Sequence, residues 1–190
     1  MNIDTYISKY QEDVHAQLGL IDTKIIDELA SDLFDCWKTG KQFFVCGNGG
    51  SGSNANHIAN DLIYGISKKK GSGIRCHSLA ANPATLLCLA NDEGYENIFS
   101  YQLSVLAEPD DILLVLSGSG NSPNILRALE EAKTARVKSY GILGFDGGKA
   151  KHLVDRAIHT SIDDMQVSED LQMVILHIIS KWLFDKRSEI

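Results

Sequence analysis

The chain has 190 residues, of which 44% are hydrophobic and 23% are charged, and its formal net charge is −7 at pH 7. This composition is typical of one globular domain, and the negative charge argues against a surface that binds nucleic acid. No stretch reaches the roughly 20 apolar residues that a membrane-spanning helix needs. Residues 1–15 carry charges throughout and lack the apolar core of a secretory signal. We therefore expect a cytoplasmic protein without a membrane or nucleic-acid partner.

Two helical patterns open the chain. Apolar residues recur at three- and four-residue steps over residues 3–18 and again over residues 22–39. Gly40 follows the second pattern directly and is a plausible helix stop. We expect the two segments to form an N-terminal helical hairpin.

Short apolar runs alternate with segments of helical period after residue 40. The runs predict strands at residues 42–47, 73–80, 111–120, 137–145 and 154–161. Helical spacing recurs at residues 55–66, 121–136 and 166–186. This alternation is typical of a parallel sheet with helices on both faces. We therefore predict an α/β fold with a five-stranded parallel sheet, in a single domain that spans residues 1–190.

A basic run, Lys68-Lys69-Lys70, separates the helical segment at 55–66 from the next strand. Its simplest interpretation is an exposed loop, because three consecutive lysines are well solvated. A loop that contacts a ligand is the alternative.

Two glycine- and serine-rich segments, residues 47–53 and 117–122, each follow a strand and precede a helix. Glycine lets backbone N–H groups approach an anion, serine adds hydroxyl donors, and a helix N-terminus adds partial positive charge. Neither segment has the lysine of a Walker motif or the spacing of a dinucleotide site, so both suit one small phosphate. The alternative is a pair of ordinary turns that use Ser and Asn as helix caps.

Histidines and carboxylates recur at helical spacing in two segments. His57 and Asp61 are four residues apart, and Glu169 and His177 are eight residues apart, so each pair lies on one side of its helix. Two imidazoles and two carboxylates could bind a divalent ion such as zinc, or could transfer protons without a metal. The alternatives are a helix-surface pair for His57 and Asp61, and a hydrogen-bonded core histidine for His177.

Asn91 and Asp92 end the apolar segment at residues 87–90, just before Gly94. They could mark a helix stop. Their functional interpretation is a pair of polar side chains that meet a sugar hydroxyl.

Together these motifs resemble those of the sugar isomerase (SIS) domain family, in order and at similar spacing from about residue 20 to the end. They are CGNGGS at 46–51 with His57, AND at 90–92, S-x-SGNS at 117–122, DGGK at 146–149, and the acidic residue eight before His177. Within the family the chain is most similar to the phosphoheptose isomerases. These interconvert sedoheptulose 7-phosphate and D-glycero-D-manno-heptose 7-phosphate, a precursor of lipopolysaccharide or capsule.

The resemblance implies a flavodoxin-like three-layer sandwich, with residues 41–190 as the α/β core and residues 1–40 used to assemble a homotetramer. It implies acid/base catalysis through a cis-enediol by Asp61 and His177. It also implies one zinc ion per subunit, bound by His57, Asp61, Glu169 and His177. The implied substrate contacts are Asn48, Gly49, Gly50, Ser51, Asp61, Asn91, Asp92, Ser117, Gly118, Ser119, Ser122 and Glu169.

The chain departs from the family pattern at four positions. Similar isomerases usually have Glu at position 61, Gln at 169, Arg at 65 and Thr at 118, where this chain has Asp61, Glu169, Gly65 and Gly118. Loss of the arginine removes a bidentate donor, so an isomerase for a different phosphosugar is one alternative. A non-catalytic phosphosugar-binding or adaptor protein is another. Catalysis is favoured because regulatory relatives lack the histidine that this chain keeps as His177.

Overall fold

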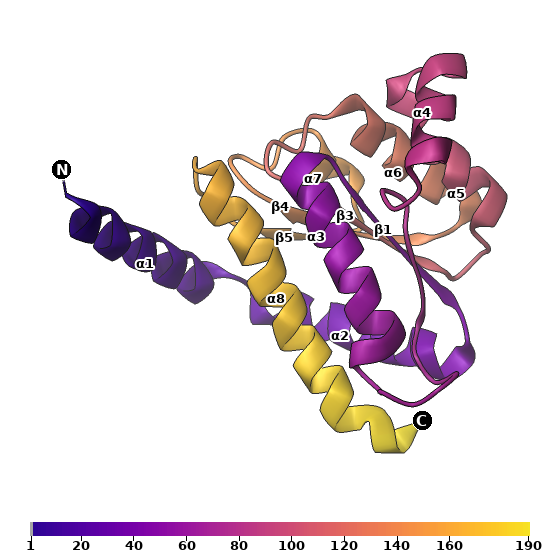
Figure 1. Cartoon of the computed structure of the whole chain (residues 1–190), viewed down its shortest axis with the longest axis horizontal. Helices are drawn as coiled ribbons and strands as arrows, with labels where there is room; N and C mark the ends of the chain where they lie inside the picture. Colours follow the sequence, from indigo (N-terminus) through magenta and orange to yellow (C-terminus); the bar gives the residue numbers. More distant parts are fainter. Residues whose placement is uncertain (1) are drawn as a thin grey trace.

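A parallel five-stranded sheet forms the middle layer of the computed structural model, which describes residues 2–190 (Figure 1). Its strands are β1 (Gln42–Gly47), β2 (Arg75–Ser78), β3 (Ile112–Ser117), β4 (Lys138–Leu143) and β5 (Arg156–His159). They lie in the order β2-β1-β3-β4-β5, and every neighbouring pair is parallel. The central strands β1 and β3 are buried throughout, which explains their unbroken apolar sequences. This strand order is the flavodoxin-like one, so the predicted fold class is confirmed.

Helices cover both faces of the sheet. They are α1 (Ile3–Leu20), α2 (Thr23–Thr39), α3 (Gly49–Asn60), α4 (Pro83–Asp92), α5 (Ser100–Leu106), α6 (Pro123–Ala135), α7 (Ala150–Leu153) and α8 (Met165–Lys186). A π-helical turn, η1 (Asp61–Gly65), continues α3, and short 3-10 turns occur at η2 (Tyr95–Asn97) and η3 (Arg187–Glu189). None of the helices within residues 2–190 has the length and apolarity needed to span a bilayer.

The sheet has a hydrophobic core on each face because successive side chains of a strand point to opposite sides. Phe43 and Val45 of β1 pack into the core beneath α2, α3 and α8. Phe44 and Cys46 pack into the core beneath α5 and α6. Buried residues of α3 and α8 belong to the first of these cores, so the two helices lie on the same face of the sheet.

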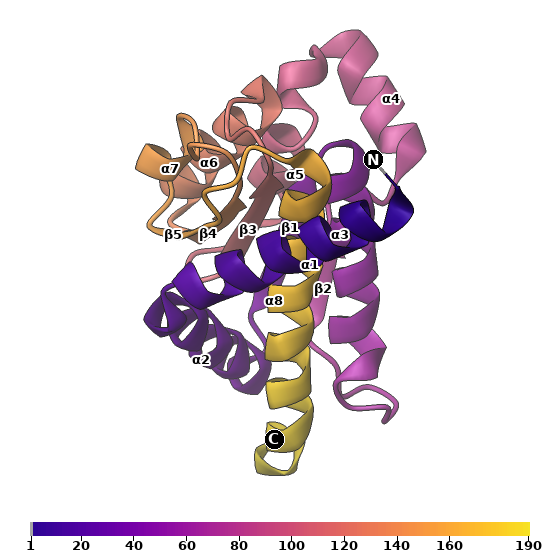
Figure 2. The same cartoon turned by 90° about the vertical axis from the view of Figure 1, so that its left-hand side faces the viewer.

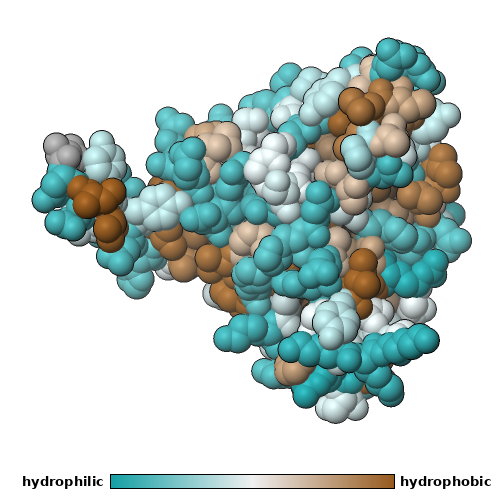
Figure 3. Space-filling view, in the orientation of Figure 1, coloured by the Kyte–Doolittle hydropathy of each residue, from teal (hydrophilic) through white to brown (hydrophobic). Residues whose placement is uncertain are grey.

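The two predicted N-terminal helices are present, but they do not pack along each other as the predicted hairpin. Instead α1 projects from the body at an angle to α2 and contacts α8 (Figures 1 and 2). Tyr10 anchors α1 to α8 through a hydrogen bond of 2.7 Å from its hydroxyl to Asp170 Oδ2. The outer half of α1 carries large side chains that are 50–70% exposed, namely Ile3, Tyr6 and Ile7. Figure 3 shows brown, hydrophobic atoms on this arm. This arm therefore offers apolar surface to another chain.

Most of the first glycine-rich segment, residues 47–53, is helical rather than a loop. β1 ends at Gly47, Asn48 is the N-cap, and α3 begins at once, so the prediction of a loop through residue 53 was wrong. A Cβ added to Gly47 would lie 2.7 Å from the backbone of Ser51, and one added to Gly52 would lie 2.7 Å from the carbonyl oxygen of Gly47. These glycines are therefore required where the start of α3 packs against the end of β1.

Gly52→Ala should destabilise the protein by about 1–3 kcal/mol, because its Cβ would meet backbone that cannot move freely. The matched control is Gly19→Ala in α1, where an added Cβ meets nothing within 4 Å. That control should stabilise the helix by up to about 1 kcal/mol. Urea unfolding of both variants measures the difference, and equal midpoints would contradict the packing explanation.

Candidate active site between α3 and α8

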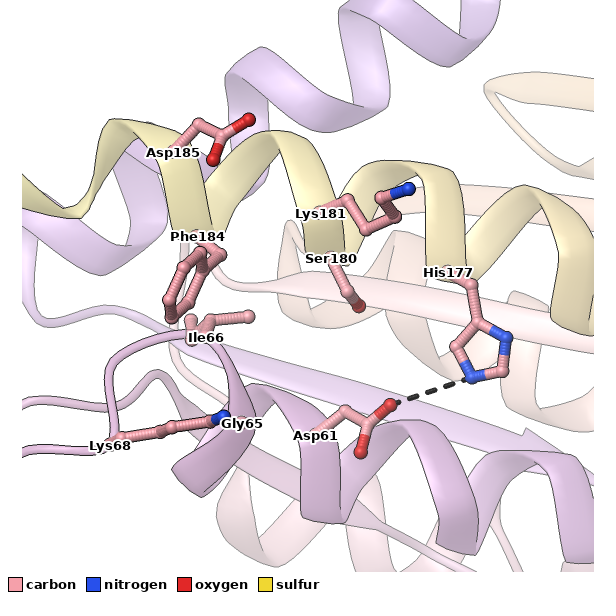
Figure 4. Close-up of a pocket in the computed structure, with 9 residues that line it drawn as sticks. All are labelled: Asp61, Gly65, Ile66, Lys68, His177, Ser180, Lys181, Phe184 and Asp185. Carbon is pink, nitrogen blue, oxygen red and sulfur yellow. Dashed lines mark ion pairs between the residues drawn. The ribbon is translucent and has the colours of Figure 1, made fainter.

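Two imidazoles and one carboxylate meet where the end of α3 passes beside α8. His57 lies in the last turn of α3, Asp61 begins η1, and His177 lies on α8, 120 residues from His57. The two histidine Nε2 atoms are 3.2 Å apart, and Asp61 Oδ2 lies 3.5 Å from each of them. Figure 4 shows Asp61 and His177 facing each other from the two helices. We call these three residues the His57–Asp61–His177 cluster.

The helical backbone changes from α to π at Asp61, the carboxylate of the cluster. In η1 the N–H of Ile66 donates to the carbonyl of Asp61 at 3.0 Å, which is the five-residue step of a π-helix. Such turns occur frequently at functional sites, because the extra residue changes the direction of the side chains around it. Here the turn follows α3 directly, so that Asp61 stands one turn beyond His57.

Hydrogen bonds between polar side chains join the N-terminal parts of α3 and α8, on the side of the cluster nearer the start of α3. Asn54 Nδ2 donates to the Glu169 carbonyl at 2.9 Å and to Gln172 Oε1 at 3.0 Å. Gln172 Nε2 donates in turn to Ser51 Oγ at 3.0 Å, in a buried contact. Buried hydrogen bonds of this kind fix the register of the helices, and so they fix the distances within the cluster.

Glu169 lies outside the cluster. Its carboxylate sits at the start of α3, so close that a Cβ at Gly50 would overlap it. Eight residues separate Glu169 from His177 on α8, a rise of about 12 Å along the helix axis. The structure therefore brings together three of the four predicted metal ligands, His57, Asp61 and His177. The helix dipole favours a carboxylate at the position where Glu169 lies.

The cluster has the dimensions of a zinc site. Bonds of about 2.05 Å in tetrahedral geometry separate the ligand atoms of a zinc ion by about 3.3 Å. The three separations observed here are 3.2, 3.5 and 3.5 Å. Two imidazoles and one carboxylate also form a donor set that suits zinc. Three protein ligands leave one coordination position open, as in catalytic zinc sites.

The second predicted loop lies at the carboxyl end of β3. Ser117 Oγ accepts a hydrogen bond of 3.0 Å from the Gly120 N–H, and Ser119 Oγ accepts one of 3.3 Å from the Asn121 N–H. Ser122 is the N-cap of α6, and its side chain makes no capping bond. A hydroxyl that accepts a bond keeps its own O–H for donation, so the loop has donors for a phosphate.

An amide pair joins the two loops. Asn48 Nδ2 donates to Asn124 Oδ1 at 2.9 Å, and Asn124 Nδ2 donates back to Asn48 Oδ1 at 2.7 Å. The Tyr95 hydroxyl donates to the same Asn48 oxygen at 3.0 Å. Asn124 and Tyr95 were not predicted as site residues. A signal was present for Asn124, since it is an amide on the apolar face of the helix that begins after Ser122.

Asn91 and Asp92 lie exposed at the end of α4, which stands at a corner of the molecule away from the cluster (Figure 1). Asn91 Nδ2 donates to Asp92 Oδ1 at 2.7 Å, and the Cys88 thiol donates to Asp92 Oδ2 at 3.5 Å. Within one chain these two residues are therefore not brought together with the cluster.

Residues 6–144 match the model of the SIS domain, so the chain belongs to the SIS domain family. It is 39% identical over 138 residues to the phosphoheptose isomerase of Helicobacter pylori (strain Shi470), covering 73% of this chain and 71% of that protein. It is 34% identical over 179 residues to the phosphoheptose isomerase of Geotalea daltonii (strain DSM 22248 / JCM 15807 / FRC-32), covering 94% and 90% of the two chains.

Solved structures share this architecture. The phosphoheptose isomerase of Francisella tularensis superposes with a TM-score of 0.87 at 27% identity, over 97% of this chain and 96% of that one. The NanR protein of Vibrio vulnificus, solved in complex with ManNAc-6P, superposes with a TM-score of 0.73 at 12% identity, over 98% of this chain and 63% of that one. The second likeness concerns the fold alone.

Proposed function

We propose that this chain is an aldose–ketose isomerase that interconverts sedoheptulose 7-phosphate and D-glycero-D-manno-heptose 7-phosphate. The observation that carries the proposal is the His57–Asp61–His177 cluster, which joins two imidazoles and a carboxylate within 3.5 Å. Its relatives named phosphoheptose isomerase reach 39% identity over 138 residues. An isomerase for a different phosphosugar and a non-catalytic phosphosugar-binding protein are the alternatives.

The chemistry moves one proton between neighbouring carbons through a cis-enediol. Asp61, the carboxylate of the cluster, takes the proton from the carbon beside the carbonyl and returns it to the neighbouring carbon. His177 gives a proton to the carbonyl oxygen as the enediol forms and takes one from the neighbouring hydroxyl as the new carbonyl forms, because an imidazole can both give and accept a proton. Asp61 and His177 face each other across 3.5 Å, so a two-carbon unit held against the cluster can lie near both side chains. A zinc ion bound at Oδ2 and Nε2 would leave Asp61 Oδ1 and the His177 Nδ1–H for proton transfer.

We assign one zinc ion per subunit to the cluster, with His57, Asp61 and His177 as ligands. The match between the observed separations and tetrahedral geometry supports the assignment. A bound zinc ion would polarise the sugar oxygens. Glu169 belongs to α8, and its carboxylate lies beside the start of α3. We assign this carboxylate to substrate binding rather than to the metal.

The phosphate is assigned to the loop at residues 117–122, where Ser117, Ser119 and Ser122 carry hydroxyl donors at the start of α6. Anchoring the phosphate there orients the rest of the sugar. The sugar chain is assigned to the residues where β1 meets α3, Asn48, Gly49, Gly50 and Ser51. Gly118, in the same loop as the serines, completes the phosphate contacts. Asn91 and Asp92 lie away from the cluster within one chain, so we propose that they contact the sugar bound by a neighbouring subunit of the assembly.

We further propose a cytoplasmic homotetramer assembled through residues 1–40. Support comes from the exposed apolar side chains of α1 and from an apolar groove of about 660 Å³ between α2 and α8. Ile7→Asp should reduce the assembly from four times the chain mass of 20.8 kDa to a smaller species. Light scattering reports the mass, with Gln11→Glu on the same helix as the control. An unchanged mass for Ile7→Asp would contradict the role of α1.

Isomerisation in deuterium oxide tests the proposed mechanism. A cis-enediol exchanges its migrating proton with solvent, so the product should carry deuterium at the carbon that receives it. Proton NMR of the reaction follows this directly. Conversion without deuterium uptake would contradict the enediol mechanism. Thermal stabilisation by a phosphosugar without conversion would favour the binding-protein alternative.

A further inference from the structure

Asn48 stands at the N-cap of α3, but its side chain does not cap that helix. An asparagine at this position normally accepts a hydrogen bond from a backbone N–H of the first turn. Here the side chain is bonded instead to two residues outside α3, Asn124 and Tyr95. The leading N–H groups of a helix have no partner within the helix itself. The first turn of α3 therefore keeps N–H groups that a ligand can use.

Asn124 uses both ends of its amide to hold Asn48. It is fully buried at the start of α6, where its Nδ2 donates to Asn48 Oδ1 at 2.7 Å and its Oδ1 accepts from Asn48 Nδ2 at 2.9 Å. Within residues 2–190, Asn48 is the only hydrogen-bond partner of this amide. Burial of an amide is unfavourable unless its polar groups are hydrogen-bonded, so the bonds to Asn48 are what make Asn124 tolerable in this position.

The same bonds leave Asn48 able to act only as a donor. Its Oδ1 accepts from Asn124 and, at 3.0 Å, from the Tyr95 hydroxyl, which fills both lone pairs of the oxygen. Its Nδ2 carries two hydrogens, and only one of them has a partner within the described residues 2–190. Asn48 is half-buried and lines a cavity of about 330 Å³ together with Gly49, so a ligand can approach it.

We infer that Asn124 and Tyr95 are positioning residues for the sugar. They hold the Asn48 side chain away from the first turn of α3, which leaves the backbone N–H groups of that turn open to the substrate. They also direct the second Asn48 N–H to an oxygen of the sugar chain. The inference rests on the proposed function, since it takes the ligand to be the phosphosugar substrate.

A double-mutant cycle tests whether the two residues act through Asn48. Titration calorimetry uses sedoheptulose 7-phosphate that has been brought to its isomer equilibrium beforehand. Asn48→Ala, Asn124→Leu and Tyr95→Phe should each weaken binding roughly 2- to 12-fold, the range for one hydrogen bond between neutral groups. In the Asn48→Ala background, neither Asn124→Leu nor Tyr95→Phe should weaken binding further, because the side chain that they position is gone.

Thermal unfolding separates positioning from a structural role. Tyr95 is 56% exposed, and Tyr95→Phe removes only its hydroxyl, so this variant should fold even if Asn124→Leu does not. Its melting temperature should equal or exceed that of the wild type, since a released Asn48 side chain can cap α3. The matched control is Tyr101→Phe on α5, where the tyrosine is 47% exposed. That control should bind as the wild type does.

Several results would overturn the inference. Losses of affinity that add to that of Asn48→Ala would show that Asn124 and Tyr95 do not act through Asn48. Wild-type affinity in Tyr95→Phe would remove Tyr95 from the role, and wild-type affinity in Asn48→Asp would exclude Asn48 as a donor. A wild type that binds no sugar phosphate overturns the inference and the proposed function together. A wild type that binds without turnover contradicts the isomerase, while the same cycle still decides the roles of Asn124 and Tyr95.

Discussion

Asp61→Asn should lower kcat for sedoheptulose 7-phosphate by about 10²- to 10⁴-fold, the usual contribution of a positioned acid/base group. Asparagine keeps the shape of the side chain but removes the charge that stands 3.5 Å from both imidazoles. It also removes the basic group that takes the proton from carbon. KM should change far less than kcat, because the proposed phosphate loop is untouched. Steady-state kinetics of the purified variant measures both constants.

Two further variants sharpen this test. Asp35→Asn, on the exposed side of α2, removes one carboxylate of the same kind and should leave kcat unchanged. Asp61→Glu restores the charge at the position where similar isomerases usually carry Glu, so it should retain far more activity than Asp61→Asn. An Asp61→Asn enzyme within twofold of the wild type would exclude Asp61 as the base.

Protein purified without added zinc should contain about one zinc ion per chain, and His177→Ala should lose it. A ligand present at a hundred times its dissociation constant adds about 2.7 kcal/mol to the free energy of unfolding. For a chain of this length, its removal should lower the melting temperature by roughly 5–11 °C. Metal analysis and thermal unfolding with and without a chelator measure the two effects.

Glu169→Ala, which removes every side-chain oxygen at this position, distinguishes the three-ligand cluster from the four-ligand set suggested by the sequence. The Glu169 carboxylate lies at the start of α3, against Gly50, so the variant should keep its zinc. His152→Ala, at an exposed position, is the control for loss of a histidine and should also keep it. Loss of zinc from Glu169→Ala would contradict the assignment of His57, Asp61 and His177 as the protein ligands.

Much of the fold could be predicted because strands buried on both faces of a parallel sheet have short, continuous apolar sequences. All five predicted strands are present, and β1 has the predicted ends. The start of α3 was missed because glycine has low intrinsic helix propensity. Close packing against β1 and α8 requires small residues there and overrides that propensity. The angle between α1 and α2 was not predictable, since it depends on contacts with α8 such as Tyr10 to Asp170.

Part of the candidate site was also predictable. Helical spacing pairs His57 with Asp61, but periodicity within one helix cannot reveal which other helix lies beside it. Helical spacing also drew attention to His177 with Glu169, and the resemblance to SIS domains assigned it to the same site as His57. The structure places the two histidine Nε2 atoms 3.2 Å apart. Glu169 shares a side of α8 with His177, but two turns of rise separate them. Asn124 was missed although its amide lies on an apolar helix face, because its partner, Asn48, is 76 residues away in the sequence.

The most direct test of the central claim is turnover of sedoheptulose 7-phosphate by the purified protein, followed by NMR with and without a chelator. The proposed function predicts accumulation of D-glycero-D-manno-heptose 7-phosphate at a rate that chelation abolishes and added zinc restores. No product from zinc-loaded wild-type protein would contradict the isomerase, and full turnover after complete removal of the metal would contradict the zinc assignment.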